Sequence, residues 1–313
     1  MIQDIHRSCI IKSTVALVLA GGFAGEFSTG YTSLPKALLP VFGRPISDYV
    51  LQALEQSDVE KIFIVQDEGA NLQKSLTPGS KCQFITRNKD NSSLGMGVFF
   101  ALEKIAEFYG NVELSKRMIV VVPCDTPLVT KDNFNQLIGK VAGKNADVTI
   151  TIIAASLLEK RYPQKNYRSI YLADYKAGYT MQNVIFVNGE FIRLKPPEEP
   201  GKLRFSFRGW DEKVLKRVED GINSIENLRH QSLFHDKLFM LWLLTKGYSS
   251  YILRFMLRLA FRSLTMSKVI EYLDGADHMQ AAYIESEEVE FSADIDRPED
   301  FQMLLGTPWK TSE

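Results

Sequence analysis

Short strand-like runs alternate with segments of helical periodicity along the first half of this chain. The runs that predict buried strands are Val15–Leu19, Lys61–Gln66, Gln83–Thr86, Met118–Val122 and Asp147–Ala154. The segments with apolar residues at helical spacing are Ile46–Gln56, Ser93–Phe108 and Asn133–Val141. This alternation indicates an α/β fold with a mostly parallel, Rossmann-like sheet and helices on both faces.

The second half of the chain changes character after a break at Pro196–Gly201. Glu212–Asp274 is helical in pattern, whereas Met279–Ile284 and Glu288–Phe291 look extended. We therefore expect one domain over residues 1–313, with a helical insertion between two strands of the same sheet. Its expected parts are an α/β core over 1–195, the insertion over 205–275, and return strands with a helix over 276–313.

The first predicted strand ends in a glycine pair, Gly21 and Gly22, and the loop that follows reaches Lys36. Glycine lets backbone N–H groups approach a ligand closely, and successive N–H groups in such a loop form a cradle for anions. A lysine supplies a mobile point charge that suits a phosphate ester. A strand, a glycine pair and a lysine in this order predict a nucleoside triphosphate site, although Lys36 could also be a solvated loop residue.

Asp125 lies just past the carboxyl end of the predicted central strand, at the edge where ligands of parallel sheets bind. Oxygen ligands opposite a phosphate-binding loop suit Mg²⁺, which takes one or two protein carboxylates. Asp294 and Asp296 are candidates for the second ligand, because residues two apart in an extended segment share a face. Asp125 could instead form a turn or helix cap, and Asp296 could cap a following helix.

Three motifs carry a family resemblance. They are the segment that contains VLAGG and PKALLPVFGRP, then VVVPCDTPLVT, then SADIDRPEDFQML. In this order they resemble the MobA-like NTP transferases, a family of nucleotidyltransferases. The resemblance implies a glycosyltransferase-A-like nucleotidyltransferase fold and Mg²⁺ as the cofactor. It implies that an aspartate of the last motif is the second metal ligand without deciding between Asp294 and Asp296, and we expect Asp296.

The resemblance also implies where a nucleotide would lie. The implied contacts are the end of the first strand, the glycine pair, the lysine and the loop that opens the next helix: Leu19, Ala20, Gly21, Gly22, Lys36, Ser93, Leu94 and Gly95. Free N–H groups at that helix start could hold a phosphate or read a base, but the same residues also make an ordinary cap. Glu26 stands near the position where related proteins carry an arginine, which puts donor specificity in doubt.

The acceptor is expected on the other side of the site. Lys165 and Arg168 lie in a basic, aromatic stretch and could hold an anionic group. The segment YTMQNVIFVN resembles the acceptor-side turn of the family, with Asn183 as the expected contact. A solvated basic loop followed by a core strand is the alternative for these residues.

These inferences predict a Mg²⁺-dependent nucleotidyltransferase in which Lys36 and Asp125 are the catalytic residues. A phosphate- or phosphonate-bearing acceptor would attack the α-phosphorus of an NTP and release pyrophosphate, with charge neutralised by the metal on Asp125 and Asp296. Two alternatives remain open. One is a glycosyltransferase that uses a nucleotide-sugar, and the other is a non-catalytic nucleotide-binding regulatory protein.

Charge and composition narrow the partners. A net charge of −1 provides no basic excess for general nucleic-acid binding. The three cysteines lack the spacing of a metal site or a disulfide framework, which favours the cytoplasm. Arg254, Arg258 and Arg262 form a basic stripe that could contact a membrane surface, although a core-packing helix with a solvated arginine face is the commoner arrangement. Association into a homo-oligomer is left open.

Overall fold

The fold is seen in a computed structural model of the chain. The described residues are 14–21, 34–88, 94–144, 146–163, 170–194, 205–208, 265, 267, 280–295 and 300. The expected helical segment Glu212–Asp274 therefore lies outside the described residues, apart from two single positions. The division of the chain into core, insertion and return segment stays a prediction.

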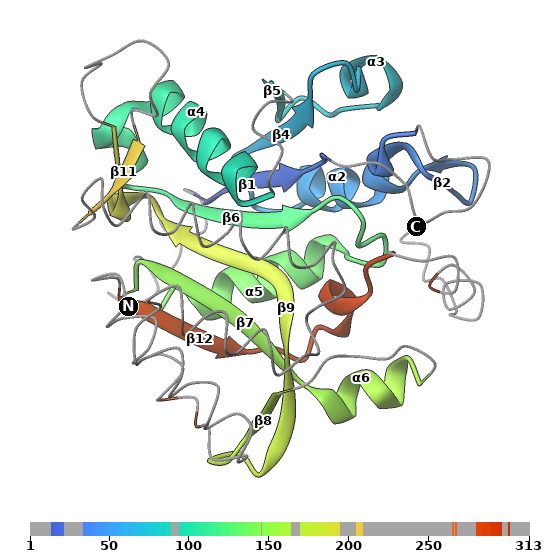
Figure 1. Ribbon diagram of the computed structural model, residues 1–313, viewed down its shortest axis with the longest axis vertical. Helices are drawn as coiled ribbons and strands as arrows, with labels where there is room; N and C mark the ends of the chain where they lie inside the picture. The colour runs from blue at the N-terminus through green and yellow to red at the C-terminus, as the bar shows by residue number, and fades with distance from the viewer. Residues whose placement is uncertain are drawn as a thin grey trace, which may run out of the picture.

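A mostly parallel sheet organises the described residues (Figure 1). Its strands are β1 (Thr14–Leu19), β4 (Lys61–Asp67), β5 (Cys82–Arg87), β6 (Met118–Pro123), β7 (Val148–Ala154), β8 (Ile170–Leu172), β9 (Ala177–Asn188) and β12 (Ala281–Glu285). The order is β12-β7-β9-β6-β1-β4-β5, and β8 pairs with β9 at the side of this path. Long β9 runs antiparallel to both β6 and β7, whereas β6-β1-β4-β5 and β7-β12 pair in parallel. The predicted α/β fold is confirmed.

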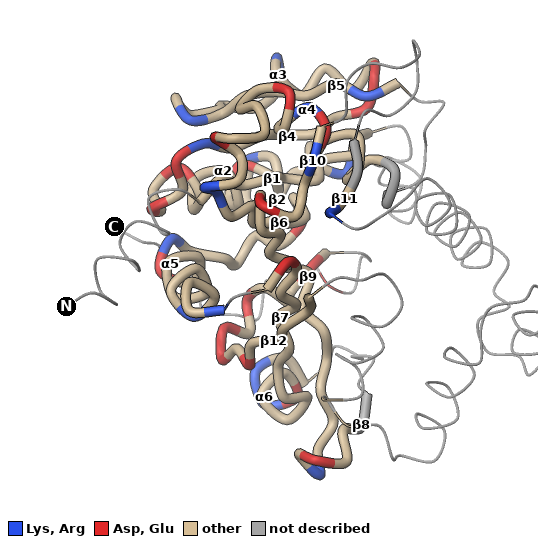
Figure 2. Tube along the Cα trace, turned by 90° about the vertical axis from the view of Figure 1, so that its left-hand side faces the viewer, with Lys and Arg blue, Asp and Glu red and all other residues tan. Residues whose placement is uncertain are grey.

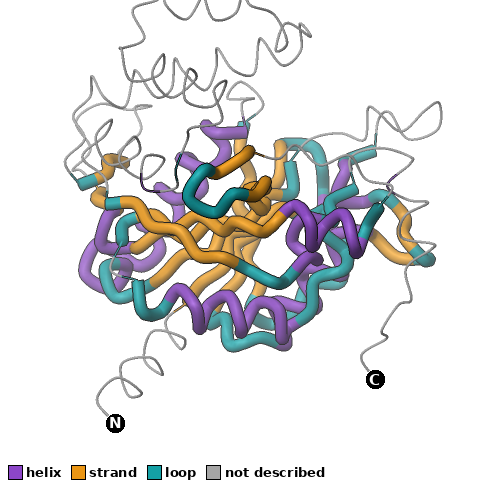
Figure 3. Tube along the Cα trace, turned by 90° about the horizontal axis from the view of Figure 1, so that it is seen from below, coloured by secondary structure: helices purple, strands orange, loops and turns teal. Residues whose placement is uncertain are grey.

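Helices pack on both faces of this sheet (Figure 3). They are α2 (Ile46–Gln56), α3 (Leu72–Ser75), α4 (Leu94–Leu114), α5 (Lys131–Val141) and α6 (Ala155–Arg161). Alternate residues of β1 show how the sequence builds the two layers. Val15 and Leu17 join the cluster that contains the apolar side of α4, while Ala16 and Val18 join the cluster beneath α2 and α5.

Charge distribution agrees with these layers. The central strands β1, β6 and β7 carry no charged residue, and charged positions collect on the helices and at strand ends (Figure 2). Strands buried on both faces are expected to be continuous apolar runs of this kind. The strand ends are therefore where charged chemistry can be placed.

Several elements differ from the sequence-based expectation. The extended structure expected at Glu288–Phe291 is wrong, because a 3-10 helix, η4 (Val289–Ser292), occupies this position. Phe291 and Ser292 are both buried, and the Phe291 ring packs edge-on against that of Phe134, with ring centroids 5.1 Å apart. Helix α4 also continues past Phe108 to Leu114, with a break from helical geometry at Gly110.

Smaller elements were not expected at all. Two-stranded pairs form between β2 (Pro40–Val41) and β3 (Arg44–Pro45), and between β10 (Ile192–Leu194) and β11 (Phe205–Phe207). A further 3-10 helix, η2 (Gly189–Phe191), follows β9. In the part of the chain that the structure describes, no helix combines the length and apolar character needed to span a membrane.

Candidate active site

Lys36 is held by a short, well-anchored segment. It begins the 3-10 helix η1 (Lys36–Leu38), which closes with a bond from the Leu38 N–H to the Pro35 carbonyl at 2.8 Å. The Ser47 hydroxyl, on α2, donates to the Ala37 carbonyl at 2.8 Å. The Ile46 N–H donates to the Leu39 carbonyl, also at 2.8 Å. The first turn of α2 therefore fixes the backbone from which the lysine side chain extends.

Asp125 is placed by the end of β6. The Cys124 N–H donates to the Leu19 carbonyl at 3.2 Å, so the chain leaving β6 stays beside the end of β1. Asp125 Oδ2 and Lys36 Nζ form an ion pair, and their side chains are only 11% and 17% exposed. Two charged residues that are far apart in the sequence thus meet at the carboxyl edge of the sheet.

The second oxygen of Asp125 has an unusual environment. Oδ1 is buried, and it accepts no hydrogen bond from any residue that the structure describes. Buried polar atoms are nearly always paired, because leaving one unpaired costs about 1–3 kcal/mol. An oxygen of this kind fits coordination of a cation. The neighbouring Cys124 offers no thiolate, since burial and the adjacent Asp125 charge raise the pKa of its thiol.

Asp294 approaches the same place from the far end of the chain. The Ile295 N–H donates to the Asp125 carbonyl at 3.0 Å, which sets the two segments side by side. Ala293 and Ile295 are fully buried, whereas Asp294 between them is half-buried. Asp296 lies outside the described residues, so the choice between Asp294 and Asp296 as a metal ligand stays a prediction.

One small apolar cluster explains why these three segments converge. Its buried members are Leu39, Val41, Ile46 and Ile295, and Leu34, Tyr49 and Leu128 pack against it. Each charged residue has a close sequence neighbour in this cluster. Leu39 lies three residues after Lys36, Leu128 lies three residues after Asp125, and Ile295 comes directly after Asp294. Burial of these apolar side chains therefore brings the charged groups to one edge of the sheet.

The acidic residues at this edge are few. Across the described ranges, no group of three or more His, Cys, Asp or Glu side chains is arranged to hold a metal ion. A second carboxylate beside Asp125 stays a prediction. One or two protein carboxylates would suit Mg²⁺, which keeps several waters and binds substrate phosphates rather than a full protein cage.

The first residues of the glycine loop lie next to this pair. The Ala20 N–H donates to the Val65 carbonyl at 3.0 Å, and the Leu19 carbonyl accepts from Cys124. These bonds extend the sheet and fix the point where Gly21 leaves it. Contacts from Leu19, Ala20 and Gly21 to a nucleotide stay predictions. Gly22, Glu26 and Ser93 lie outside the described residues, while Leu94 and Gly95 form the start of α4.

An ion pair beside Gly21 was missed by the sequence analysis. Arg87 Nε and Asp67 Oδ1 pair at the carboxyl ends of adjacent parallel strands, β5 and β4, with side chains 8% and 13% exposed. The signal was present, because Asp67 and Arg87 each directly follow a predicted buried strand, Lys61–Gln66 and Gln83–Thr86. Opposite charges at the ends of two such strands can meet only if the strands are neighbours, which the sequence did not show.

The acceptor-side residues are only partly described. Asn183 lies exposed on β9, two residues from the last described pairing with β6, between Val121 and Ile185. This part of β9 lies at the same edge of the sheet as Asp125, because β9 is antiparallel to β6. Lys165 and Arg168 lie outside the described residues, so their role stays a prediction.

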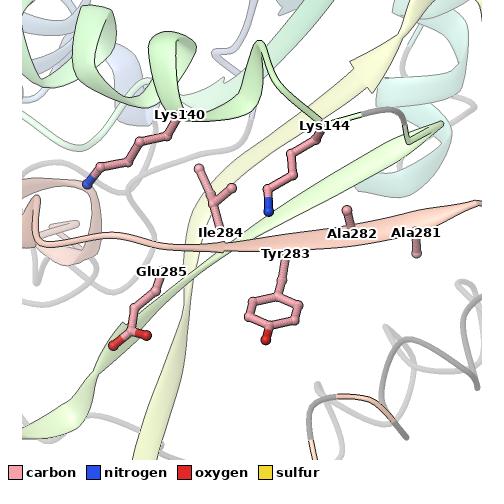
Figure 4. A pocket seen from close by; sticks show the side chains of 7 residues that line it. All are labelled: Lys140, Lys144, Ala281, Ala282, Tyr283, Ile284 and Glu285. Carbon is pink, nitrogen blue, oxygen red and sulfur yellow. The ribbon is translucent and has the colours of Figure 1, made fainter.

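A shallow cavity of about 570 Å³ lies elsewhere, along β12 (Figure 4). Its lining residues are Lys140, Lys144, Ala281, Ala282, Tyr283, Ile284 and Glu285. None of them belongs to the predicted site. Lys140 and Lys144 extend from the α5 side, and Tyr283 points to the opposite face of β12. The charged edge around Asp125 is the better candidate, because it combines buried opposite charges with an unpaired carboxylate oxygen.

Comparison with known proteins gives this edge a family context. Residues 16–168 match the family described as the MobA-like NTP transferase domain. The matched range covers just under half of the chain. Lys36 and Asp125 both fall inside the matched range, as do Asp67 and Arg87. The family assigned by resemblance from the sequence motifs is thereby confirmed for this part of the chain.

Two curated relatives match shorter stretches of the chain. A Sulfolobus acidocaldarius protein that bears the name of a mannose-1-phosphate guanyltransferase is 49% identical over 49 residues, which cover 16% of this chain and 14% of that protein. The bifunctional protein GlmU of Enterococcus faecalis is 28% identical over 140 residues, 45% of this chain and 28% of that protein. The chain thus spans less than a third of the length of these curated relatives.

A solved structure extends the likeness of fold. A hypothetical transferase from Thermus thermophilus aligns with a TM-score of 0.62, covering 92% of this chain and 99% of that one, at 21% identity. At this identity the alignment supports the fold and nothing finer. It agrees with the mostly parallel sheet described above.

Proposed function

We propose that this protein is a Mg²⁺-dependent nucleotidyltransferase that moves a nucleoside monophosphate from an NTP to a phosphate- or phosphonate-bearing acceptor. One observation carries the proposal. The Lys36–Asp125 ion pair is nearly buried at the carboxyl edge of the sheet, beside the end of β1, with Asp125 Oδ1 unpaired among the described residues. A cation and a polyphosphate would satisfy both charged groups at once.

The reaction needs no nucleophile from the protein. An oxygen of the acceptor attacks the α-phosphorus, the bond from that phosphorus to the bridging oxygen of the β-phosphate breaks, and pyrophosphate leaves with the bonding electrons. Lys36 would turn from Asp125 to the triphosphate and offset negative charge as it builds up. Gly21 and Gly22 would hold the phosphates by backbone N–H groups and align them for in-line attack.

Asp125 and one of Asp294 and Asp296 would hold Mg²⁺. Nucleotidyltransferases commonly use a divalent metal, and the unpaired oxygen of Asp125 fits this use. When bound, the ion would neutralise phosphate charge and orient the attacking and leaving oxygens. Asp125 would fix the position of the ion, because the Asp125 backbone is held between Ile295 and the end of β6.

A sugar 1-phosphate is the acceptor class that the relatives' names favour, since one of them is named for mannose-1-phosphate. Asn183, exposed on β9, would bind a hydroxyl group of the acceptor, and Lys165 with Arg168 would hold its anionic group. We also propose a cytoplasmic location, where NTPs are supplied and where Cys82 and Cys124 would stay the free thiols seen in the structure.

The test is a product assay on the full chain. Each of the four NTPs is incubated with a panel of sugar 1-phosphates and phosphonates, with and without Mg²⁺, and pyrophosphate is measured. We expect pyrophosphate release with one NTP, dependent on both acceptor and Mg²⁺. Release of a nucleoside diphosphate from a nucleotide-sugar would support a glycosyltransferase instead. Nucleotide binding without consumption across the panel would identify a regulatory protein.

A further inference from the structure

Arg87 stands between two glycines that belong to different parts of the proposed nucleotide site. A Cβ atom added at Gly97, in the first turns of α4, would lie 2.3 Å from Arg87 Nη1. A Cβ added at Gly21 would lie 3.1 Å from Nη2 and 3.3 Å from Asp67 Oδ2. The two Nη atoms of one guanidinium therefore define the space beside both glycines.

Neither glycine is explained by backbone conformation alone. Gly97 is inside a helix, where alanine would normally be favoured by about 1 kcal/mol. A contact closer than 3.0 Å forces something to move, and at Gly97 the group that would have to move is the end of the Arg87 side chain. The glycine in the helix and the arginine on the strand are matched to each other.

Asp67 holds the guanidinium in this position. Its carboxylate pairs with Arg87 Nε from the neighbouring strand, and both side chains are nearly buried. Burying a charged pair costs desolvation free energy, so such a pair is weak evidence for stability and is more often kept for a specific arrangement. Arginine suits this role because its planar guanidinium has five donors in a fixed geometry.

We propose that Arg87 is a positioning residue for the nucleotide, with Asp67 as its anchor. It sets the spacing between the Gly21 loop after β1 and the start of α4, which are the two segments expected to contact the NTP. The inference rests on the proposed function, because it assigns a role in the same site. Arg87 acts through the two segments, so it should govern nucleotide affinity rather than the chemical step.

The first test measures NTP affinity and kinetics for Arg87→Ala. ATP, GTP, CTP and UTP, each with Mg²⁺, serve as probes by calorimetry. We expect at least a tenfold loss of affinity for the preferred NTP and a matching rise in KM, with kcat within about threefold of the native value. Arg87→Lys should keep the charge beside Asp67 but not span both glycines, so it should recover thermal stability more than affinity.

Arg117→Ala is the matched control. Arg117 is also a mostly buried arginine, paired with Glu60 at 3.1 Å and Glu113 at 3.3 Å, but it lies just before β6, at the opposite edge of the sheet. We expect this variant to lose stability without a change in NTP affinity. Equal NTP affinities for Arg87→Ala and the native chain would overturn the inference.

A double-mutant cycle provides the sharper test. Gly97→Ala should displace the guanidinium in the native chain and lower NTP affinity about tenfold. In the Arg87→Ala background the added methyl group has room, so it should change affinity less than twofold. Additive losses in the two backgrounds would contradict a shared role.

The outcomes separate this inference from the proposed function. If pyrophosphate is released but Arg87→Ala leaves KM unchanged, the positioning role alone fails. If the native chain binds an NTP in an Arg87-dependent way but transfers nothing, the transferase proposal fails and the positioning role stands. A native chain that binds none of the four NTPs contradicts both.

Discussion

Asp125 and Asp147 are both buried carboxylates next to strands of the same sheet, but their surroundings differ. Asp147 precedes β7, and both of its oxygens are paired, Oδ1 with Arg208 at 2.6 Å and Oδ2 with the Gln280 N–H at 3.0 Å. Asp125 follows β6, and one of its oxygens is buried without a donor in the described part of the chain. The paired oxygens of Asp147 suit a structural role, whereas the unpaired oxygen of Asp125 fits the ligand proposed above.

The ion pairs at the amino and carboxyl edges of the sheet differ in how exposed they are. At the amino edge, Arg117 pairs with Glu60 and Glu113, whose side chains are 39% and 52% exposed. Exposed pairs contribute little, because water and salt screen them. At the carboxyl edge both members of the Lys36–Asp125 and Arg87–Asp67 pairs are nearly buried. Of these pairs, the two that are nearly buried on both sides therefore lie at the edge where parallel sheets bind ligands.

Replacing Asp125 should give the largest effect. Asp125→Ala would remove the carboxylate that we propose binds the metal, and a metal contributes several kcal/mol to the transition state of phosphate chemistry. We expect kcat to fall by roughly three decades, which corresponds to about 4 kcal/mol. Pyrophosphate release at saturating NTP and Mg²⁺ measures it, and retained turnover would remove Asp125 from the mechanism.

Replacing Lys36 should have the next largest effect. A charge-assisted hydrogen bond to phosphate contributes about 2 kcal/mol, so Lys36→Gln should raise KM for the NTP about thirtyfold. The amide keeps a donor but not the charge. Initial rates across a range of NTP concentrations give this value. A KM equal to that of the native chain would show that Lys36 does not contact the nucleotide.

Asp147→Asn should lower stability and leave activity nearly unchanged. The amide cannot accept from both Arg208 and the Gln280 N–H as the carboxylate does, so the free energy of unfolding should fall by about 2 kcal/mol. Chemical denaturation measures this loss. The kcat/KM of the folded protein should stay within twofold of native, and a loss of activity comparable to that of Asp125→Ala would erase the contrast between the two carboxylates.

Glu288 is a second paired carboxylate, and its contribution to stability should depend on pH. Burial would raise its pKa, but hydrogen bonds from Ser286 and Lys140 outweigh burial and lower it. A carboxyl group whose pKa is lower in the folded than in the unfolded state stabilises the fold at pH values above its unfolded-state pKa. This stabilisation is lost as the pH falls through the folded-state pKa. Glu288→Gln should therefore cost about 1.5 kcal/mol at pH 7. The difference in stability between this variant and the native chain should become smaller below about pH 4. Thermal unfolding measured over a range of pH values tests this.

The sequence allowed most of the central sheet to be predicted, because strands buried on both faces are continuous apolar runs. Met118–Val122 and Lys61–Gln66 differ from the observed β6 and β4 by one residue. The antiparallel direction of β9 was not predictable in this way, since its residues alternate buried and exposed in either direction. Helix η4 was missed because its short sequence has no clear helical pattern, and the contact of its Phe291 with Phe134 joins segments far apart in the chain.

The sequence by itself determined the α/β alternation, the glycine loop after the first strand and the presence of an aspartate after a central strand. These features are local, so apolar periodicity and residue type are enough to reveal them. The tertiary structure alone decided that Lys36 pairs with Asp125, that the segment around Asp294 lies beside them, and that Arg87 fills the space left by two glycines. Such contacts depend on which strands are neighbours and on long-range burial of apolar side chains, and no local pattern specifies either.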